Sequence, residues 1–243
     1  MPSYWKHVNQ VLDKADIIIE VLDARAVKDS RNIEIERKVE KSKKKLLVVI
    51  NKCDLVDINK LKGKLRMFKH AVFISSKDHL GTTILKKKIL ELSRGNQVTV
   101  AVVGYPNVGK SSLINALAGR GAARTSSESG YTKGYQLVRV DRKIMLLDSP
   151  GVYPHKEKNI KKHSRIGAAG YSKIKDPEMA AIHLINDEKK IIEKKWQIQG
   201  EDADAILEAI AFKFGKLQKG GKPNIEAAAR FLLKEWQTGR INK

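Results

Sequence analysis

The chain has 243 residues, with 48 Lys or Arg against 27 Asp or Glu, so its formal net charge is +21. Its length allows one or two domains with a hydrophobic core, and its 42% of hydrophobic and 31% of charged residues exclude an intrinsically disordered chain. No apolar stretch reaches the roughly 18 residues of a membrane span, which excludes a transmembrane protein.

The N-terminus has no apolar signal-peptide core, and the single cysteine, Cys53, cannot form an intrachain disulfide. We therefore expect a cytoplasmic protein without a membrane partner. A net charge of +21 exceeds what solubility requires and favours a polyanionic partner such as RNA, bound by a strongly salt-dependent attraction.

Apolar runs of strand length alternate with charged stretches of helical period along the first part of the chain. We expect strands at residues 17–22, 46–50, 71–74, 98–103, 135–140 and 144–147, and helices at residues 32–44, 57–69, 82–93 and 111–118. The last two strands are separated by Asp141-Arg142, which favours an antiparallel hairpin. The alternation before them predicts an α/β fold, with a mostly parallel sheet between two layers of helices.

After Pro154 no further strand run occurs, and apolar residues fall at helical spacing in residues 203–214 and 225–236. The glycines and the proline of residues 215–223 mark a break between these two helices. The sequence thus predicts an α/β domain at residues 1–155 and a small, basic, all-α domain at residues 156–243.

Residues Gly104–Ser111 match the pattern GxxxxGK[ST], between an expected strand and an expected helix. In such a phosphate loop the glycines let backbone N–H groups curl around phosphate oxygens, and the helix N-terminus adds positive potential. Lys110 would bind the β- and γ-phosphates, and the Ser111 hydroxyl would bind Mg²⁺. The other phosphate-binding residues that we expect here are Asn107, Val108, Gly109 and Ser112.

The form DxxG occurs at Asp148 and Gly151, directly after the last expected strand. Asp148 would hold Mg²⁺ through a water molecule, and the Gly151 N–H would contact the γ-phosphate. A threonine from the flexible-looking segment 124–134 should complete the Mg²⁺ site; Thr132 is the best placed and Thr125 is the alternative. Ordinary turn and loop residues are the competing interpretation of these positions.

Two further motifs each follow an expected strand: Asn51-Lys52-Cys53-Asp54 and Ser75-Ser76-Lys77. The first resembles NKxD, the guanine-recognition motif of the GTPase superfamily, and the second resembles its companion SxK loop. The resemblance implies that Asp54 pairs with guanine N1 and N2, that the Lys52 stem covers the ring, and that the Ser76 N–H meets O6. A carboxylate paired in this way rejects adenine, which would leave it without partners.

The order of the motifs is circularly permuted relative to Ras-like GTPases, since NKxD and SxK precede the phosphate loop. Permutation at an exposed joint is permissible because the ends of such a domain lie close together. The order resembles the RbgA/YlqF branch of circularly permuted GTPases, which are assembly factors of the large ribosomal subunit, and Asp23-Ala24-Arg25 matches that branch as well. The resemblance implies a Mg²⁺-dependent GTPase that docks on rRNA of a large-subunit precursor.

Two residues depart from Ras-like enzymes. Val152 stands where those enzymes have the glutamine that orients the attacking water, and Asn107 is a feature that accompanies a potassium ion in related GTPases. We therefore expect slow intrinsic hydrolysis, with Lys110 and Thr132 as catalytic residues and with K⁺ or a ribosomal group supplying further charge stabilisation. His163, within a run of basic residues, is more simply a surface residue.

In the permuted order Gly151 leads straight into the helical domain, so we expect the nucleotide state to control binding to the large-subunit precursor. The two domains are about equally basic, which predicts that both contact RNA. Two alternatives stay open: a GTPase acting on another RNA, in tRNA modification or translation, and an RNA-binding module with GTP as a structural ligand. We expect a monomer.

Overall fold

The computed structural model describes residues 3–119, 136–149 and 171–241. The chain divides into two compact units, Met1–Glu157 and Lys158–Lys243, and each is described by itself. Five residues to which a role is assigned or denied above lie outside the described residues, and the expectations for them stay predictions. They are Thr125, Thr132, Gly151, Val152 and His163.

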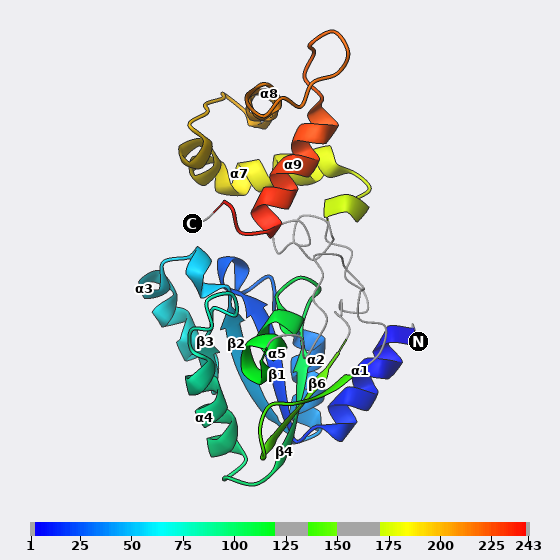
Figure 1. Ribbon diagram of the computed structural model, residues 1–243, viewed down its shortest axis with the longest axis vertical. Helices are drawn as coiled ribbons and strands as arrows, with labels where there is room; N and C mark the ends of the chain where they lie inside the picture. The colour runs from blue at the N-terminus through cyan, green and yellow to red at the C-terminus, as the bar shows by residue number, and fades with distance from the viewer. Residues whose placement is uncertain (1–2, 120–135, 150–170, 242–243) are drawn as a thin grey trace. The chain divides into compact units, whose positions relative to one another are not determined.

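Six strands of the described residues form one sheet in the order β3-β2-β1-β4-β6-β5 (Figure 1). The parallel strands are β1 (Ile17–Asp23), β2 (Lys45–Asn51), β3 (Ala71–Phe73), β4 (Val98–Val103) and β6 (Ile144–Asp148). β5 (Gln136–Arg139) pairs antiparallel with β6, so the predicted hairpin and the mostly parallel α/β sheet are confirmed. Every residue of β1 is buried, as is typical of a central strand that is covered on both faces.

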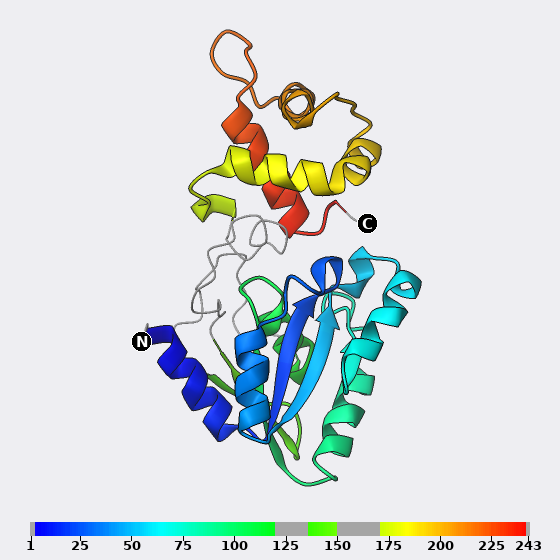
Figure 2. The same cartoon turned by 180° about the vertical axis from the view of Figure 1, so that it is seen from behind.

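Helices cover both faces of this sheet (Figures 1 and 2). On one face, α1 (Ser3–Lys14) and α2 (Ile33–Lys41) share a hydrophobic cluster with Ile18 of β1. On the other face, α5 (Lys110–Ala118) packs against β6, with α4 (Thr82–Leu92) beside it. These layers leave the carboxyl ends of the parallel strands for the loops that carry the motifs.

The prediction of a helix at residues 57–69 is wrong beyond Leu61. α3 spans only Ile58–Leu61, and a 3₁₀ segment, Lys62–Met67, follows it. Gly63 lies within the expected helix, where glycine is about 1 kcal/mol less favourable than alanine. Leu61 is the buried residue of α3, so little packing compensates for that cost.

Helix α1 is absent from the sequence-based expectations. Val8, Val11 and Leu12 are buried on it at helical spacing, so the signal for an amphipathic helix is present in the sequence. The expectation missed it because the segment also contains many polar residues.

The second unit is helical, as predicted. It contains α7 (Pro177–Trp196), α8 (Ala203–Lys213) and α9 (Ile225–Gln237), which pack on one another around a core that includes Trp236. Each helix begins at a side-chain cap that accepts a backbone N–H three residues further on. The caps are Asp176, Asp202 and Asn224. Among the described residues, no helix is long and apolar enough to cross a bilayer.

Candidate functional site

The motif residues meet at the carboxyl edge of the parallel sheet. Asn51 ends β2 and Asp148 ends β6, while the loops after β3 and β4 carry Ser75-Ser76 and Gly104–Ser111. The chain order reverses between β1 and β4, because β2 and β3 follow on the far side of β1. Ligands of open α/β sheets bind outside the carboxyl ends of the strands at such a switch point.

Two glycines allow the loop between β4 and α5 to take its path. Gly104 has φ 145° and Gly109 has φ 98°. A Cβ on Gly104 would lie 2.6 Å from Val21 O, and one on Gly109 would lie 2.3 Å from Asn51 Nδ2. The loop therefore passes β1 and β2 too closely for any side chain at these positions, and it leads its backbone N–H groups into the N-terminus of α5, an arrangement that suits an anion.

Lys110 is the cation of this loop. Its side chain is buried, and its Nζ donates to Tyr105 O at 2.8 Å and to Gly104 O at 3.2 Å. Burial lowers the pKa of Lys110 to about 8, and the neighbouring Asp148 carboxylate opposes this shift. Backbone carbonyls thus hold the ammonium group against the loop, as a phosphate-binding lysine requires.

Asp148 and Ser111 form an oxygen-only pair beside this loop. The Ser111 hydroxyl donates to Asp148 Oδ2 at 3.3 Å, and Asp148 Oδ1 is buried without a hydrogen-bond partner among the described residues. Burial raises the pKa of Asp148, and Lys110 opposes the rise. A buried carboxylate oxygen next to a hydroxyl fits a hard divalent cation such as Mg²⁺. Ser112, the next residue of α5, is exposed.

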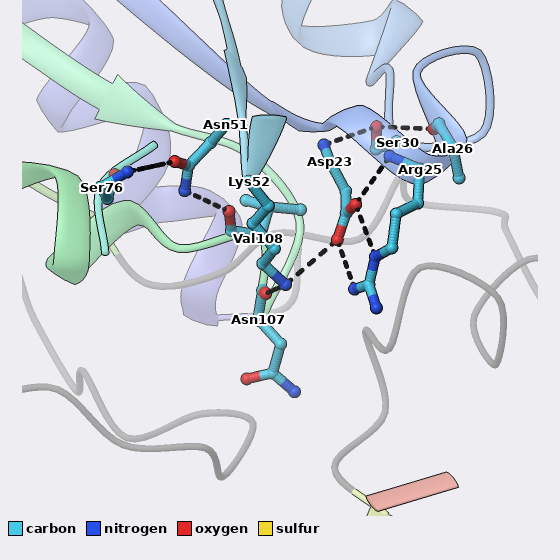
Figure 3. A network of polar contacts seen from close by, with 9 residues as sticks. All are labelled: Asp23, Arg25, Ala26, Ser30, Asn51, Lys52, Ser76, Asn107 and Val108. Atoms are coloured by element: carbon cyan, nitrogen blue, oxygen red, sulfur yellow. Dashed lines mark hydrogen bonds and ion pairs between the residues drawn. The ribbon is translucent and has the colours of Figure 1, made fainter. Parts of the chain in front are cut away.

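Asn51 joins the guanine motif to both neighbouring loops (Figure 3). Its Nδ2 donates to Val108 O at 2.9 Å. Its Oδ1 accepts from Ser76 N at 3.1 Å and from Ser76 Oγ at 2.8 Å. The side chain therefore ties the phosphate loop to the loop after β3, which is a structural role that the sequence alone did not distinguish from a contact with the base.

The expected base-pairing carboxylate, Asp54, is exposed at the same edge. The Ser75 hydroxyl lies 2.8 Å from Asp54 Oδ1 and 2.9 Å from Asp78 Oδ2, so it can orient the Asp54 carboxylate. Because the Ser76 N–H donates to Asn51, a contact of this N–H with guanine O6 would have to share or replace that hydrogen bond.

Cys53 and Lys77 complete the two guanine motifs. Cys53 is buried, its N–H donates to Ile74 O at 3.1 Å, and burial raises the pKa of its thiol. This backbone hydrogen bond ties the turn after β2 to the residue that follows β3. Lys77 is exposed.

Lys52 is held between two acceptors, one at the end of β1 and one in the phosphate loop. Its backbone is left-handed (φ 62°), and its Nζ donates to Asn107 O at 2.7 Å and lies 3.0 Å from Asp23 Oδ2. Asp23 belongs to the site and was not among the residues expected in it. The signal that could have found it was the Asp23-Ala24-Arg25 match, together with its position at the end of a strand next to β2.

Sequence comparison finds similarity to GTP-binding proteins. Residues 99–213 match the sequence model of a family described as 50S ribosome-binding GTPase. An uncharacterized GTP-binding protein of Methanocaldococcus jannaschii is 38% identical over 246 residues, which are 98% of this chain and 65% of that protein. Nucleolar GTP-binding protein 2 of Neurospora crassa is 32% identical, and the alignment covers 98% of this chain and 40% of that protein. The chain thus spans only part of the length of these relatives.

Two solved structures have a similar fold over almost the whole chain. YlqF of T. maritima with bound GNP superimposes with a TM-score of 0.70 at 23% identity, over 99% of this chain and 95% of that chain. The GDP-bound structure of this YlqF also gives a TM-score of 0.70, over 97% of this chain and 96% of that one. The chain therefore has the fold of YlqF, with the strand order and the motif positions described above.

Proposed function

We propose that the protein binds and hydrolyses GTP, and that the bound nucleotide controls its attachment to rRNA of a large ribosomal subunit precursor. The proposed binding of the nucleotide rests on the Asn51 side chain, which bridges the phosphate loop and the loop after β3. Motifs that lie far apart in the sequence are thereby assembled at one strand edge.

Each end of the nucleotide has its own proposed residues. Guanine is bound by residues 51–54 and 75–77, with Asp54 reading N1 and N2. The phosphates are bound by residues 107–112, together with Thr132 and Gly151. Mg²⁺, which supplies charge neutralisation between the β- and γ-phosphates, is held by Ser111, Asp148 and Thr132.

Hydrolysis in this proposal depends on charge stabilisation more than on a positioned base. Lys110, held by two carbonyls, would stabilise charge on the transferred phosphoryl group, and Thr132 is its proposed partner in catalysis. Since Val152 cannot orient water, the intrinsic rate is slow, and K⁺ near Asn107 or a ribosomal group accelerates it. Equal turnover in Na⁺ and K⁺ buffers would remove the potassium part of this proposal.

The loop between α8 and α9 supports an RNA contact by the helical unit. Its lysines are Lys213, Lys216, Lys219 and Lys222. No acidic residue occurs from residue 209 to residue 225. The Gln218 N–H donates to Lys222 O and the Asn224 N–H to Lys216 O, both at 2.8 Å, so the loop is a defined hairpin.

Figures 1 and 2 show this lysine loop (residues 213–222) standing out from the helices of its own unit. Phe212 and Leu217 beside it are 56% and 43% exposed. Lysines around exposed apolar side chains suit a partner that offers both phosphates and bases. The relatives named nucleolar GTP-binding proteins also favour a ribosomal partner. In a cell that has a nucleolus, they favour that compartment over the cytoplasm.

The test is cosedimentation of the protein with large-subunit precursors in the presence of a GTP analogue or of GDP, with phosphate release measured alongside. We expect the retained fraction to differ between the two nucleotides and the precursors to stimulate hydrolysis. Equal retention of the protein with the two nucleotides would contradict the proposal that the nucleotide controls attachment. Stimulation by another RNA instead would favour the tRNA or translation alternative, and the absence of phosphate release under every condition would favour GTP as a structural ligand.

A further inference from the structure

The motif Asp23-Ala24-Arg25 has no part in the function proposed above. Asp23 is the last residue of β1 and lies in register with Asn51, so it is next to the backbone that turns into Lys52. The side chains of Asp23 and Arg25 are both 0% exposed. A fully buried ion pair is costly to desolvate, which makes its position at the edge of a ligand site informative.

The Asp23 carboxylate is fixed from several sides (Figure 3). Its Oδ1 accepts from Arg25 N and from Arg25 Nε, each at 3.0 Å, and its Oδ2 accepts from Arg25 Nη2 at 2.7 Å. The Asp23 N–H donates to Ser30 Oγ at 3.0 Å, and that hydroxyl donates to Ala26 O at 2.8 Å. Arg25 therefore fixes the orientation of the carboxylate, whereas Ser30 contacts only the Asp23 backbone.

In that orientation Asp23 Oδ2 also forms an ion pair with Lys52, whose Nζ lies 3.0 Å away. The same Nζ donates to Asn107 O at 2.7 Å, so Lys52 joins the end of β1 to the phosphate loop. The carbonyl of Asn107 alone would leave the ammonium free to swing around one acceptor. Two acceptors fix its position, and with it the path of the aliphatic stem.

Asp23 also offsets the unfavourable electrostatics of the Lys52 ammonium. Burial lowers the pKa of Lys52, Arg25 lowers it further, and Asp23 opposes both. Although burial alone would raise the pKa of Asp23, the neighbouring Arg25 and Lys52 hold it well below its usual range. The Asp23 carboxylate thus lies between the buried cation of Arg25 and the partly buried cation of Lys52.

We propose that Asp23 is a positioning residue of the guanine site, which fixes the ammonium of Lys52 so that the Lys52 stem can cover the guanine ring. Arg25 holds the carboxylate in place for this purpose. The inference rests on the proposed binding of guanine nucleotides. It assigns a task in nucleotide recognition to a motif outside the phosphate-binding and guanine-binding sets.

The test compares Asp23→Asn with Asp23→Asn/Arg25→Gln by titrating fluorescent GDP. Removing one partner of a buried charge pair should weaken GDP binding about 10-fold to 100-fold in the single variant. If Asp23 served only to neutralise Arg25, the double variant, which removes both charges, would regain wild-type affinity. We expect it to stay weak, because Lys52 still lacks its acceptor. The double variant also carries the test if the single variant does not fold.

A cycle with Lys52→Met separates positioning from general stability. In the Lys52→Met background, Asp23→Asn should change GDP affinity less than twofold, since the group that Asp23 positions is gone. Ser30→Ala is the matched control: it removes a hydrogen bond to the Asp23 backbone and leaves every contact of the Asp23 carboxylate and of Lys52 in place, so GDP affinity should stay unchanged. Equal GDP binding by the wild type and Asp23→Asn, or full additivity in the cycle, would overturn the inference. A wild-type protein that binds no GDP would instead overturn the proposed function.

Discussion

Gly109 lies where the phosphate loop passes the guanine motif. Its φ is 98°, and an added Cβ would lie 2.3 Å from Asn51 Nδ2. Gly109→Ala should therefore displace the Asn51 amide and break its bond to Val108 O. We expect GDP affinity to fall about tenfold or more and the free energy of unfolding to fall by about 1–3 kcal/mol, measured by titration and urea denaturation.

Gly119 provides the control for this variant. It has nearly the same φ, 97°, but nothing lies within 4 Å of its added Cβ. Gly119→Ala should cost about 1–2 kcal/mol of unfolding free energy through backbone strain alone and leave GDP affinity unchanged. If both variants bind GDP equally well, the close approach at Gly109 does not matter for the site.

Glu20 makes the stability of the first unit depend on pH. It is buried in the middle of β1, and its Oε1 accepts from Asn32 N at 2.6 Å. Burial and the Glu36 carboxylate raise its pKa from 4.5 to about 8, against the opposing effects of the Asn32 N–H and of Arg31. The folded state therefore keeps a proton that the unfolded state loses, and stability falls from pH 4.5 to about pH 8.

Glu20→Gln should remove this dependence, because the amide oxygen can still accept from Asn32 and nothing titrates. Relative to the wild type, the free energy of unfolding of the variant should rise by about 3–4 kcal/mol between pH 5 and pH 8, measured by urea denaturation. Glu40→Gln, on the exposed side of α2, should show no such trend. A difference between wild type and Glu20→Gln that does not change with pH would contradict the assignment.

The positions of Lys110 and Asp54 at the carboxyl edge of the sheet could be predicted, because each belongs to a short motif that follows a strand. The contact between Asp23 and Lys52 could not, because it depends on the register of β1 against β2, which no local pattern encodes. The hydrogen bond from Asn51 to Val108 joins residues that are 57 positions apart, so it also depends on how the strands pair in the folded sheet.

At the scale of elements, the strands follow their β-branched runs closely, since a central parallel strand is apolar along its whole length. The helices were less predictable. Gly63 ends α3 early, and α1 is helical because its apolar residues pack on the sheet, which composition alone does not reveal.

The lysine loop is the element whose proposed task is most directly testable. Lys219→Glu/Lys222→Glu should weaken binding to large-subunit rRNA and make the salt dependence of binding shallower, by roughly 0.7 in the logarithmic slope for each phosphate that is no longer neutralised. Fluorescence anisotropy over a series of salt concentrations measures both quantities.

A pair of exposed lysines on α7 gives the matched control. Lys190→Glu/Lys194→Glu makes the same change in net charge within the same unit. It should weaken RNA binding less and leave the salt slope closer to that of the wild type. Equal weakening in the two double variants would mean that net charge alone, and not the loop, attracts RNA.

For the molecule as a whole, the division into two units predicts that their stabilities can be separated. Trp236 is fully buried in the helical unit, and Trp236→Ala should cost that unit about 3–5 kcal/mol. All the described site residues belong to the first unit, so GDP affinity should stay within about twofold of the wild type. Circular dichroism and GDP titration on the same samples measure the two effects.

Phe212→Ala is the control for this truncation. Phe212 belongs to the same unit but is 56% exposed, so its removal should cost less than about 0.5 kcal/mol. A clear fall in GDP affinity with Trp236→Ala would show that the helical unit is required for nucleotide binding.

The strand order has a consequence for synthesis of the chain. Translation completes β1, β2 and β3 before β4, although β1 pairs with both β2 and β4. A nascent chain that ends before Val98 therefore carries the guanine motif but leaves one edge of its most buried strand unpaired, which is a surface for chaperones or for aggregation. Phosphate contacts of GTP cannot stabilise this first half, because the phosphate loop is made after it and β6 with Asp148 is made later still. Nucleotide binding therefore marks the completion of the domain.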